Sequence, residues 1–243
     1  MTEATPHLVR HYQSLDDQQA DFRNANLIEL IANTVSGDFV ADLGCGAGLL
    51  VAALRHRAKR VIGIEPSLEL VRLAKSLHPD ADIRQGSAEN VASLLSEPVD
   101  AFILIDVLEH IEDDRSVLQK LRLLLQAHGE LVILVPAYPT LFGIRDRLHG
   151  HFRRYKRKSF VKMLEEAGYV VKTTRYWNML AVPLYFISER LLHRELTSKF
   201  RKKSPGIVAS FVNRLLSLWF RYVENHVNLG FGLSLLVVAR RKL

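Results

Sequence analysis

The chain has little cysteine, no long apolar run and few acidic residues in its C-terminal part. Cys45 is the only cysteine among 243 residues, so no intramolecular disulfide can form, and we expect a reducing, cytoplasmic location. The polar segment 1–17 has no apolar region of the kind that directs secretion. The longest apolar runs, 179–187 and 231–238, are far shorter than the roughly 20 residues that a membrane-spanning helix needs. We therefore predict neither a secretory leader nor a transmembrane helix.

The net charge of +7 is distributed unevenly along the chain. Residues 1–140 carry 12 Lys and Arg against 20 Asp and Glu, whereas residues 141–243 carry 21 against 6. Such an excess of basic residues favours an anionic partner. A phospholipid surface, a phosphorylated or carboxylated small molecule and nucleic acid all meet that description.

The sequence also lacks the G-x-x-x-x-G-K-[ST] pattern of nucleoside-triphosphate loops. It contains instead the segment Asp42-Leu-Gly-Cys-Gly-Ala-Gly48, which follows a buried apolar run and precedes a helical pattern. A glycine turn between a strand and a helix lets the backbone approach a nucleotide-like ligand. Its G-x-G-x-G spacing is one residue shorter than the dinucleotide pattern. Glu65 ends the next apolar run, where a carboxylate can accept hydrogen bonds from both hydroxyls of a ribose.

From residue 39 onward, apolar runs alternate with segments of helical periodicity. Continuous apolar runs such as 101–105 and 131–135 are typical of a parallel sheet covered on both faces. The predicted strands are 39–43, 60–65, 81–85, 99–105, 129–135, 169–176 and 231–240. The predicted helical segments are 49–57, 68–77, 89–95, 114–126 and 159–167. The predicted capping residues are Ser67, Asp113 or Asp114, and Ser159 at N-termini, and Gly168 at a C-terminus.

The glycine turn together with Glu65 resembles the class I S-adenosylmethionine-dependent methyltransferases, of the type 11 and 12 groups. The resemblance covers roughly residues 35–175 and the final strand, and it extends distantly to the ubiquinone-pathway O-methyltransferases. It implies an α/β fold with a seven-stranded Rossmann-like methyltransferase sheet, mostly parallel, whose last strand is antiparallel. It further implies a single domain over 1–243, with a helical cover over 1–35 and a helical insertion or lid over 177–230, before the last strand.

The resemblance implies S-adenosylmethionine as the cofactor. The backbone of the glycine turn would hold its amino-acid end, and Glu65 would hold its ribose. Ser87 stands where the family usually has an acid beside the adenine amine, so we assign that contact to the Ser87 hydroxyl or to the Ala88 backbone. The implied cofactor-binding residues are Asp42, Gly44, Cys45, Gly46, Gly48, Glu65, Ser87, Ala88 and Asp106.

An acid-rich segment follows the predicted fourth strand. Asp106, Glu109 and His110 are spaced so that one helical turn could bring them together. In the resembled enzymes a similar group has been linked to a divalent ion, whereas the alternative is that these acids cap the next helix. Three such residues without further ligands do not establish a metal site, so we predict no metal. His110 is a candidate general base or a wall of the site.

Residues 145–155 hold two His, four Arg and aromatic residues, in the loop that borders the acceptor in the resembled fold. His149 or His151 is a candidate to take the acceptor proton. The candidates to bind an anionic group on the acceptor are Arg145, Arg153, Arg154 and Tyr155. The alternative is a solvated basic loop. Tyr12 is a further candidate, to close over the cofactor.

The insertion 177–230 contains two amphipathic patterns separated by the basic run 199–203. The first pattern carries Leu180, Leu184, Ile187 and Leu191. The second carries Val208, Phe211, Val212, Leu215, Trp219 and Tyr222. One interpretation is a lid or a homodimer surface that packs on the sheet. The other is reversible attachment to an anionic membrane surface, which would make the protein peripheral on the inner face of a membrane.

These observations predict a methyltransferase that methylates an oxygen atom of a small, lipid-like or otherwise amphiphilic, or anionic acceptor, with presentation at a membrane as one hypothesis. A nucleic-acid (RNA) methyltransferase is the alternative. It is less favoured, because no Asn-Pro-Pro-Tyr type motif follows the fourth strand and no RNA-binding module is evident. A non-catalytic protein that binds the cofactor or a partner is the third hypothesis.

Overall fold

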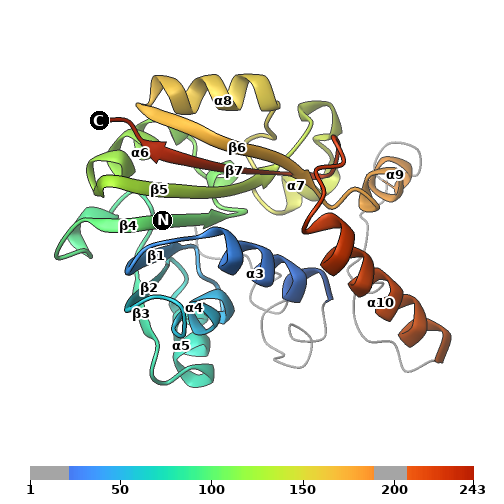
Figure 1. Ribbon diagram of the computed structural model, residues 1–243, viewed down its shortest axis with the longest axis horizontal. Coiled ribbons are helices and arrows are strands. Elements are labelled where there is room, and N and C mark those ends of the chain that lie inside the picture. Colours follow the sequence, from blue (N-terminus) through green and yellow to red (C-terminus); the bar gives the residue numbers. More distant parts are fainter. Residues whose placement is uncertain (1–21, 189–206) are drawn as a thin grey trace.

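The computed structural model describes residues 22–188 and 207–243. It contains a seven-stranded sheet in the order β3-β2-β1-β4-β5-β7-β6, with helices on both faces (Figure 1). The strands are β1 (Phe39–Leu43), β2 (Arg60–Glu65), β3 (Asp82–Gln85), β4 (Val99–Ile105), β5 (Leu125–Pro136), β6 (Tyr169–Trp177) and β7 (Ser234–Arg241). The first five are parallel to one another, and β7 is antiparallel to both β5 and β6. This topology confirms the predicted fold class.

The helices alternate with the strands as the periodicity predicts. They are α3 (Phe22–Thr34), α4 (Leu49–Leu54), α5 (Leu68–Leu77), α6 (Asp114–Leu123), α7 (Ile144–Leu148), α8 (Arg157–Glu166), α9 (Ala181–Phe186) and α10 (Ile207–Trp219). Three 3-10 turns are η1 (Val91–Ser93), η2 (Leu108–His110) and η3 (Pro139–Leu141), and a π-helical turn, η6 (Phe220–Glu224), extends α10. Residue 12, Leu191 and the basic run 199–203 lie outside the described residues.

Two of the predicted N-caps are confirmed and one is wrong. The Ser67 hydroxyl accepts a hydrogen bond from the Leu70 amide (3.4 Å), and Asp113 accepts one from the Ser116 amide (3.0 Å). Ser159 is not a cap, because α8 begins two residues earlier and the Ser159 hydroxyl donates to a backbone carbonyl instead. Gly168 follows α8 in the left-handed region (φ +87°), as a C-terminal glycine does.

Alternate side chains of the central strands enter two apolar layers. On β4, Phe102 and Leu104 pack in the layer that includes side chains of α6 and α8. Ala101 and Ile103 point the other way, into the layer that includes side chains of α3, α4 and α5. All four are fully buried, which explains why such strands are apolar throughout rather than alternating.

The described part of the insertion packs against the N-terminal helix α3. Asn225 donates a hydrogen bond from its side-chain amide to the Asn26 carbonyl (2.9 Å), and the Asn26 amide donates to the Ser217 hydroxyl (3.3 Å). Figure 1 shows α10 running outward from the sheet beside α3. The side chains of Phe211 and Leu215 are 61% and 50% exposed, so that part of the predicted apolar stripe does not pack on the sheet.

No helix among the described residues has the length and apolar character needed to cross a membrane.

Candidate functional site

The glycine turn lies between β1 and α4, at the carboxyl ends of the parallel strands. Gly44, Gly46 and Gly48 all have left-handed backbones, with φ of +72°, +55° and +79°. A Cβ atom on Gly44 would also lie 2.5 Å from the Val107 side chain. Glycine is therefore required by conformation at all three positions, and at Gly44 by space as well. Backbone amides of such a turn are available to a ligand.

Glu65 at the end of β2 holds this turn in place. Its carboxylate accepts hydrogen bonds from the amides of Gly46 and Ser67, both at 3.0 Å. Burial raises the pKa of Glu65, and the two backbone hydrogen bonds oppose that rise. Glu65 is predicted to bind the ribose of the cofactor. In the structure its carboxylate also orders the glycine turn through the Gly46 amide.

Asp42 at the end of β1 is the second buried carboxyl group here. It is 3% exposed, and burial together with the charge of Glu65 raises the pKa of Asp42 to about 8. Two acids at the ends of neighbouring strands form a site that favours a ligand with positive charge and hydrogen-bond donors, since such a ligand would offset the cost of burying both.

The remaining predicted cofactor residues lie at the ends of the neighbouring strands. The Ser87 amide donates to the Asn90 side chain (2.7 Å), and Ala88 is buried. The half-buried Cys45 has a pKa raised by burial first and by nearby carboxylates second, so its thiol stays protonated. It would contribute to a ligand site through its backbone.

Asp106 has an unusual conformation and an unpredicted partner. Its φ is +52°, and its carboxylate forms an ion pair with Arg23 of α3 at 3.8 Å. The Arg23 guanidinium also lies over the Trp177 ring, 5.0 Å from its centroid. Arg23 was missed because nothing in the local sequence of α3 connects it with a strand end so far along the chain.

The structure brings the three predicted histidines together. The ring centroids of His110 and His151 are 4.6 Å apart in an edge-to-face arrangement, and those of His149 and His151 are 6.1 Å apart. Burial and then the neighbouring His151 lower the pKa of His110 to about 4, so His110 is neutral near pH 7. His149 places Nδ1 2.8 Å from the Arg145 carbonyl.

Glu109 lies beneath this histidine cluster and is fully buried. Among the described residues, neither of its carboxylate oxygens has a hydrogen-bond partner. Burial, followed by the charge of Asp106, raises the pKa of Glu109 well above its ordinary value. One potential ligand atom from each of Glu109, His110 and His151 lies within 4.8 Å of the others, close enough for the three to hold one cation. Asp106, the third residue of the sequence-based trio, is not in this group.

Two of the four predicted acceptor-binding residues, Arg154 and Tyr155, have buried side chains. Arg154 is 8% exposed, and its guanidinium forms an ion pair with Asp146 at 2.8 Å. The Tyr155 hydroxyl lies 3.1 Å from the Leu108 carbonyl and 3.0 Å from the Asp114 carboxylate. Their side chains are thus engaged inside the protein. A cationic loop sequence does not distinguish a buried arginine from a solvated one.

Arg153 is about one-third exposed and forms an ion pair with Asp114 at 3.1 Å. It also donates to the Glu112 carbonyl (2.7 Å). Arg145 lies on α7, a short helix within the segment that the sequence presented as a loop. Arg145 and Arg153 therefore keep their place as candidates to meet an anionic acceptor.

Sequence reasoning also missed Asp146, which lies on α7 between two arginines and is fully buried. It accepts hydrogen bonds from the Gly143 amide (2.8 Å) and from Arg154, and it lies 2.9 Å from His151 Nδ1. Its position in the sequence, an acid among basic residues, was the signal that could have identified it as an ion-pair partner.

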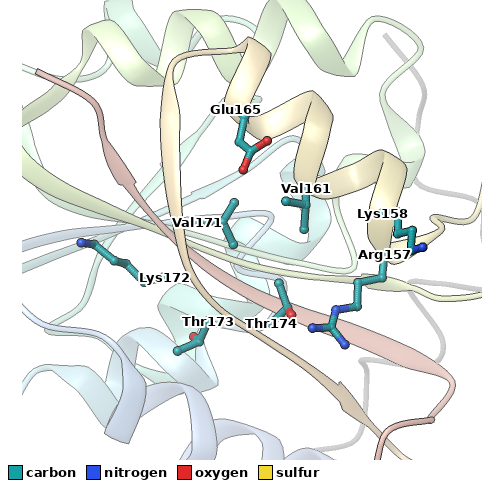
Figure 2. Close-up of a pocket in the computed structure, with 8 residues that line it drawn as sticks. All are labelled: Arg157, Lys158, Val161, Glu165, Val171, Lys172, Thr173 and Thr174. Carbon is teal, nitrogen blue, oxygen red and sulfur yellow. The ribbon is translucent and has the colours of Figure 1, made fainter.

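A separate open cavity of about 440 Å³ lies between α8 and β6 (Figure 2). It is lined by Arg157, Lys158, Val161, Glu165, Val171, Lys172, Thr173 and Thr174. Strand β6 is at the far edge of the sheet, and β7, β5 and β4 separate it from β1. This cavity is therefore distinct from the strand-end site that carries the glycine turn and the histidines.

The part of the chain that carries the glycine turn, Glu65 and His110 is similar to known proteins. Residues 41–133 match the family model described as a methyltransferase domain. The ubiquinone biosynthesis O-methyltransferase of Bradyrhizobium diazoefficiens is 29% identical over 178 residues, which are 68% of this chain and 62% of that protein. The human mitochondrial ubiquinone biosynthesis O-methyltransferase is 33% identical over 132 residues, which are 49% of this chain and 36% of that protein.

Among solved structures, the N-methyltransferase NodS from Bradyrhizobium japonicum, in complex with S-adenosyl-L-homocysteine, superposes with a TM-score of 0.59. It is 15% identical, and the match covers 99% of each chain. At that identity the likeness concerns the fold. The aligned part of this chain spans less than two thirds of both curated relatives.

Proposed function

Because the chain belongs to the class I S-adenosylmethionine-dependent methyltransferases, we propose that it transfers a methyl group from S-adenosylmethionine to an oxygen atom of a small, amphiphilic or anionic acceptor. The names of the curated relatives support oxygen as the methylated atom, since both are O-methyltransferases. The basic character of residues 141–243 supports an anionic acceptor.

The strongest support for the cofactor is the pair of buried carboxyl groups beside the glycine turn. S-adenosylmethionine carries an α-ammonium group and two ribose hydroxyls, which are the donors that Asp42 and Glu65 can accept. Glu65 already orders the Gly46 amide at 3.0 Å, so the turn is preorganised before a ligand arrives. When bound, the cofactor supplies a methyl group on a positively charged sulfur, which is ready for in-line displacement.

The protein then has to align the acceptor and remove its proton. The cluster of His110, His149 and His151 is the candidate for removing the proton, since histidine is the side chain that most often serves as a general base. His110 is neutral because burial lowers its pKa to about 4. In this proposal the histidines face the acceptor hydroxyl, and Arg145 and Arg153 provide positive charge for an anionic group.

We also propose that the acceptor is presented at a membrane surface. Several apolar side chains of α9, of its C-cap and of α10 are exposed by two fifths or more, namely Leu184, Phe186, Ile187, Phe211, Val212, Leu215 and Leu218. The sequence between these helices includes the basic run 199–203. Exposed apolar residues next to Lys and Arg favour reversible attachment to anionic lipid. Flotation with anionic and with neutral vesicles tests this: binding that ignores lipid charge would contradict it.

The methyl-transfer proposal is tested with labelled S-adenosylmethionine and fractionated cell extract, followed by mass spectrometry of the labelled product. We expect a labelled small molecule or lipid, and loss of label with Glu65→Ala. Labelled RNA would favour the nucleic-acid alternative. Tight binding of S-adenosylhomocysteine with no labelled product in any fraction would favour a non-catalytic role.

A further inference from the structure

We propose that Asp146 is a positioning residue that holds His151 as the general base of the site. This inference rests on the proposed methyl transfer and deepens it, since it selects one histidine of the three and names the group that orients it. His151 Nδ1 lies 2.9 Å from Asp146 Oδ1, and the His151 side chain is 14% exposed. A carboxylate can only accept, so Nδ1 carries the ring proton. Nε2 is then left as the proton acceptor.

Asp146 is itself held by three donors. Oδ2 accepts from the Gly143 amide at 2.8 Å and from the Tyr185 hydroxyl at 3.0 Å, and Arg154 Nε lies 2.9 Å from Oδ1 and 2.8 Å from Oδ2. Burial alone would raise the pKa of Asp146, but the hydrogen bonds from His151 and Arg154 hold it well below its usual range. The carboxylate therefore stays ionised and keeps its orientation.

The groups that surround His151 come from η2 and from the segment that contains α7. The titratable and charged groups that face it are Asp146, His110, His149, Glu109 and, through Asp146, Arg154. His110 is neutral near pH 7 because its pKa is lowered to about 4. It therefore places no positive charge against His151 at that pH.

The same network reaches the insertion. Tyr185 belongs to α9, and its hydroxyl lies between Asp146 and Arg154 Nη2, which donates to it at 2.6 Å. The Arg154 guanidinium also lies over the Tyr185 ring, 4.6 Å from its centroid. A movement of α9 would therefore change the hydrogen bonds of the Asp146 carboxylate, which orients His151.

The substitution Asp146→Asn gives a sharp test, because the Gly143 amide and the Tyr185 hydroxyl, which both donate to Oδ2, require the asparagine oxygen at that position. The amide nitrogen must then occupy the Oδ1 position and donate to His151 Nδ1, which forces the proton onto Nε2 and removes the base. We expect kcat to fall at least about 100-fold, the usual contribution of a general base, with KM changed by less than about threefold.

Three further variants separate orientation from simple structural damage. His151→Gln should lower kcat as much as Asp146→Asn, and the double variant should be no slower than His151→Gln alone, since the two residues act as one unit. His128→Gln is the matched control, because His128 is exposed near the start of β5 and has no part in the proposed site, and we expect its kcat to stay within about threefold of the wild-type value. Similar losses for all three single variants would overturn the assignment.

A spectroscopic measurement tests the pair even when no acceptor is known. In ¹⁵N-correlated spectra of the full chain, we expect the His151 proton on Nδ1 in the wild-type protein and on Nε2 in Asp146→Asn. An Nε2 proton in the wild-type protein would overturn the proposal whatever the enzyme does. The expected tautomer together with an absence of methyl transfer would instead point to failure of the proposed function. Turnover that is lost with a chelator and restored by a divalent ion would also overturn it, since His151 would then be a ligand.

Discussion

Asn225 of the insertion joins Asn26 of the N-terminal helix through a 2.9 Å hydrogen bond to the backbone carbonyl, and it also accepts one from the Trp177 indole at 3.1 Å. Trp177 is fully buried at the end of β6. One side chain therefore ties the insertion, the N-terminal helix and the sheet together at the edge where the strands end.

We predict that Asn225→Ala lowers the free energy of unfolding by about 1–3 kcal/mol, because the Trp177 indole N–H is left without its acceptor. Urea denaturation measures the loss, and hydrogen exchange should locate it in α3 and α10. Asn228→Ala is the matched control, since Asn228 also donates to a backbone carbonyl, that of Thr174, but is exposed. Equal losses for the two variants would contradict the prediction.

Asp42 should make the protein less stable as the pH rises. Its pKa is raised from 3.8 to about 8 in the folded protein, so the folded state holds a proton that the unfolded state releases. The stability that this proton provides is fully present below about pH 4 and is lost as the pH rises to about 8. Asp42→Asn should be more stable than the wild-type protein at pH 8, by an advantage that grows by up to about 1.4 kcal/mol for each unit that the pH rises between about 4 and 8.

Unfolding in urea at pH 5, 7 and 9 would measure this difference without cofactor present. The same variant should bind S-adenosylhomocysteine more weakly, because its side chain can no longer be ionised. Parallel stability profiles for the two proteins would contradict a raised pKa at Asp42.

Gly44→Ala should be more damaging than an alanine at another left-handed glycine. A Cβ at Gly44 would lie 2.5 Å from the Val107 side chain, whereas a Cβ at Gly230, which has φ +81°, would meet nothing within 4 Å. Gly230→Ala should cost about 1–2 kcal/mol from backbone strain alone. We expect Gly44→Ala to exceed that cost in thermal or urea unfolding and to reduce cofactor binding. Equal losses of stability in the two variants would contradict the prediction and show that the turn or Val107 can shift to accommodate the added Cβ.

Glu109→Gln should raise stability at neutral and higher pH. The folded protein raises the pKa of Glu109, so ionisation of this carboxyl opposes folding as the pH rises above its unfolded value of about 4.5. An amide of the same size removes that penalty. Glu112→Gln, at an exposed position in the same segment, is the control and should change little. A loss of stability in Glu109→Gln above pH 7 would show that the carboxylate has a partner that the present geometry does not reveal.

Much of the fold could be predicted because each strand is an uninterrupted apolar run bounded by helical periodicity. The bounds of β1, β2, β4 and α5 agree with prediction to the residue. The prediction was less accurate after α6, which ends at Leu123 rather than at residue 126. Leu125 instead pairs with Val99 and begins β5, and this long-range pairing leaves no mark in local periodicity.

The residues of the site also fall into two groups, those that the sequence could predict and those that depend on long-range packing. The glycines, Asp42 and Glu65 are adjacent in sequence to the strands that position them, so spacing alone indicated their role. The sequence did not predict that His110 approaches His149 and His151, since the three were named separately as candidate bases, the loop residues only because the resembled fold places that loop beside the acceptor. Arg23 could not be found, because its partner depends on how an N-terminal segment packs against distant parts of the chain. The basic residues around Asp146 indicated an ion pair, but its contact with His151 depends on how the short helix α7 packs.

The sheet places its last-synthesised strand between two earlier ones. β7 pairs with β5 on one side and with β6 on the other, and both of those strands leave the ribosome before it does. Until β7 arrives, a nascent chain exposes two unpaired strand edges, which are the features that promote association with other chains. Translation pauses or truncations before residue 234 should therefore yield aggregates rather than a weakened enzyme, and the demand for chaperones should fall sharply once the final strand is in place.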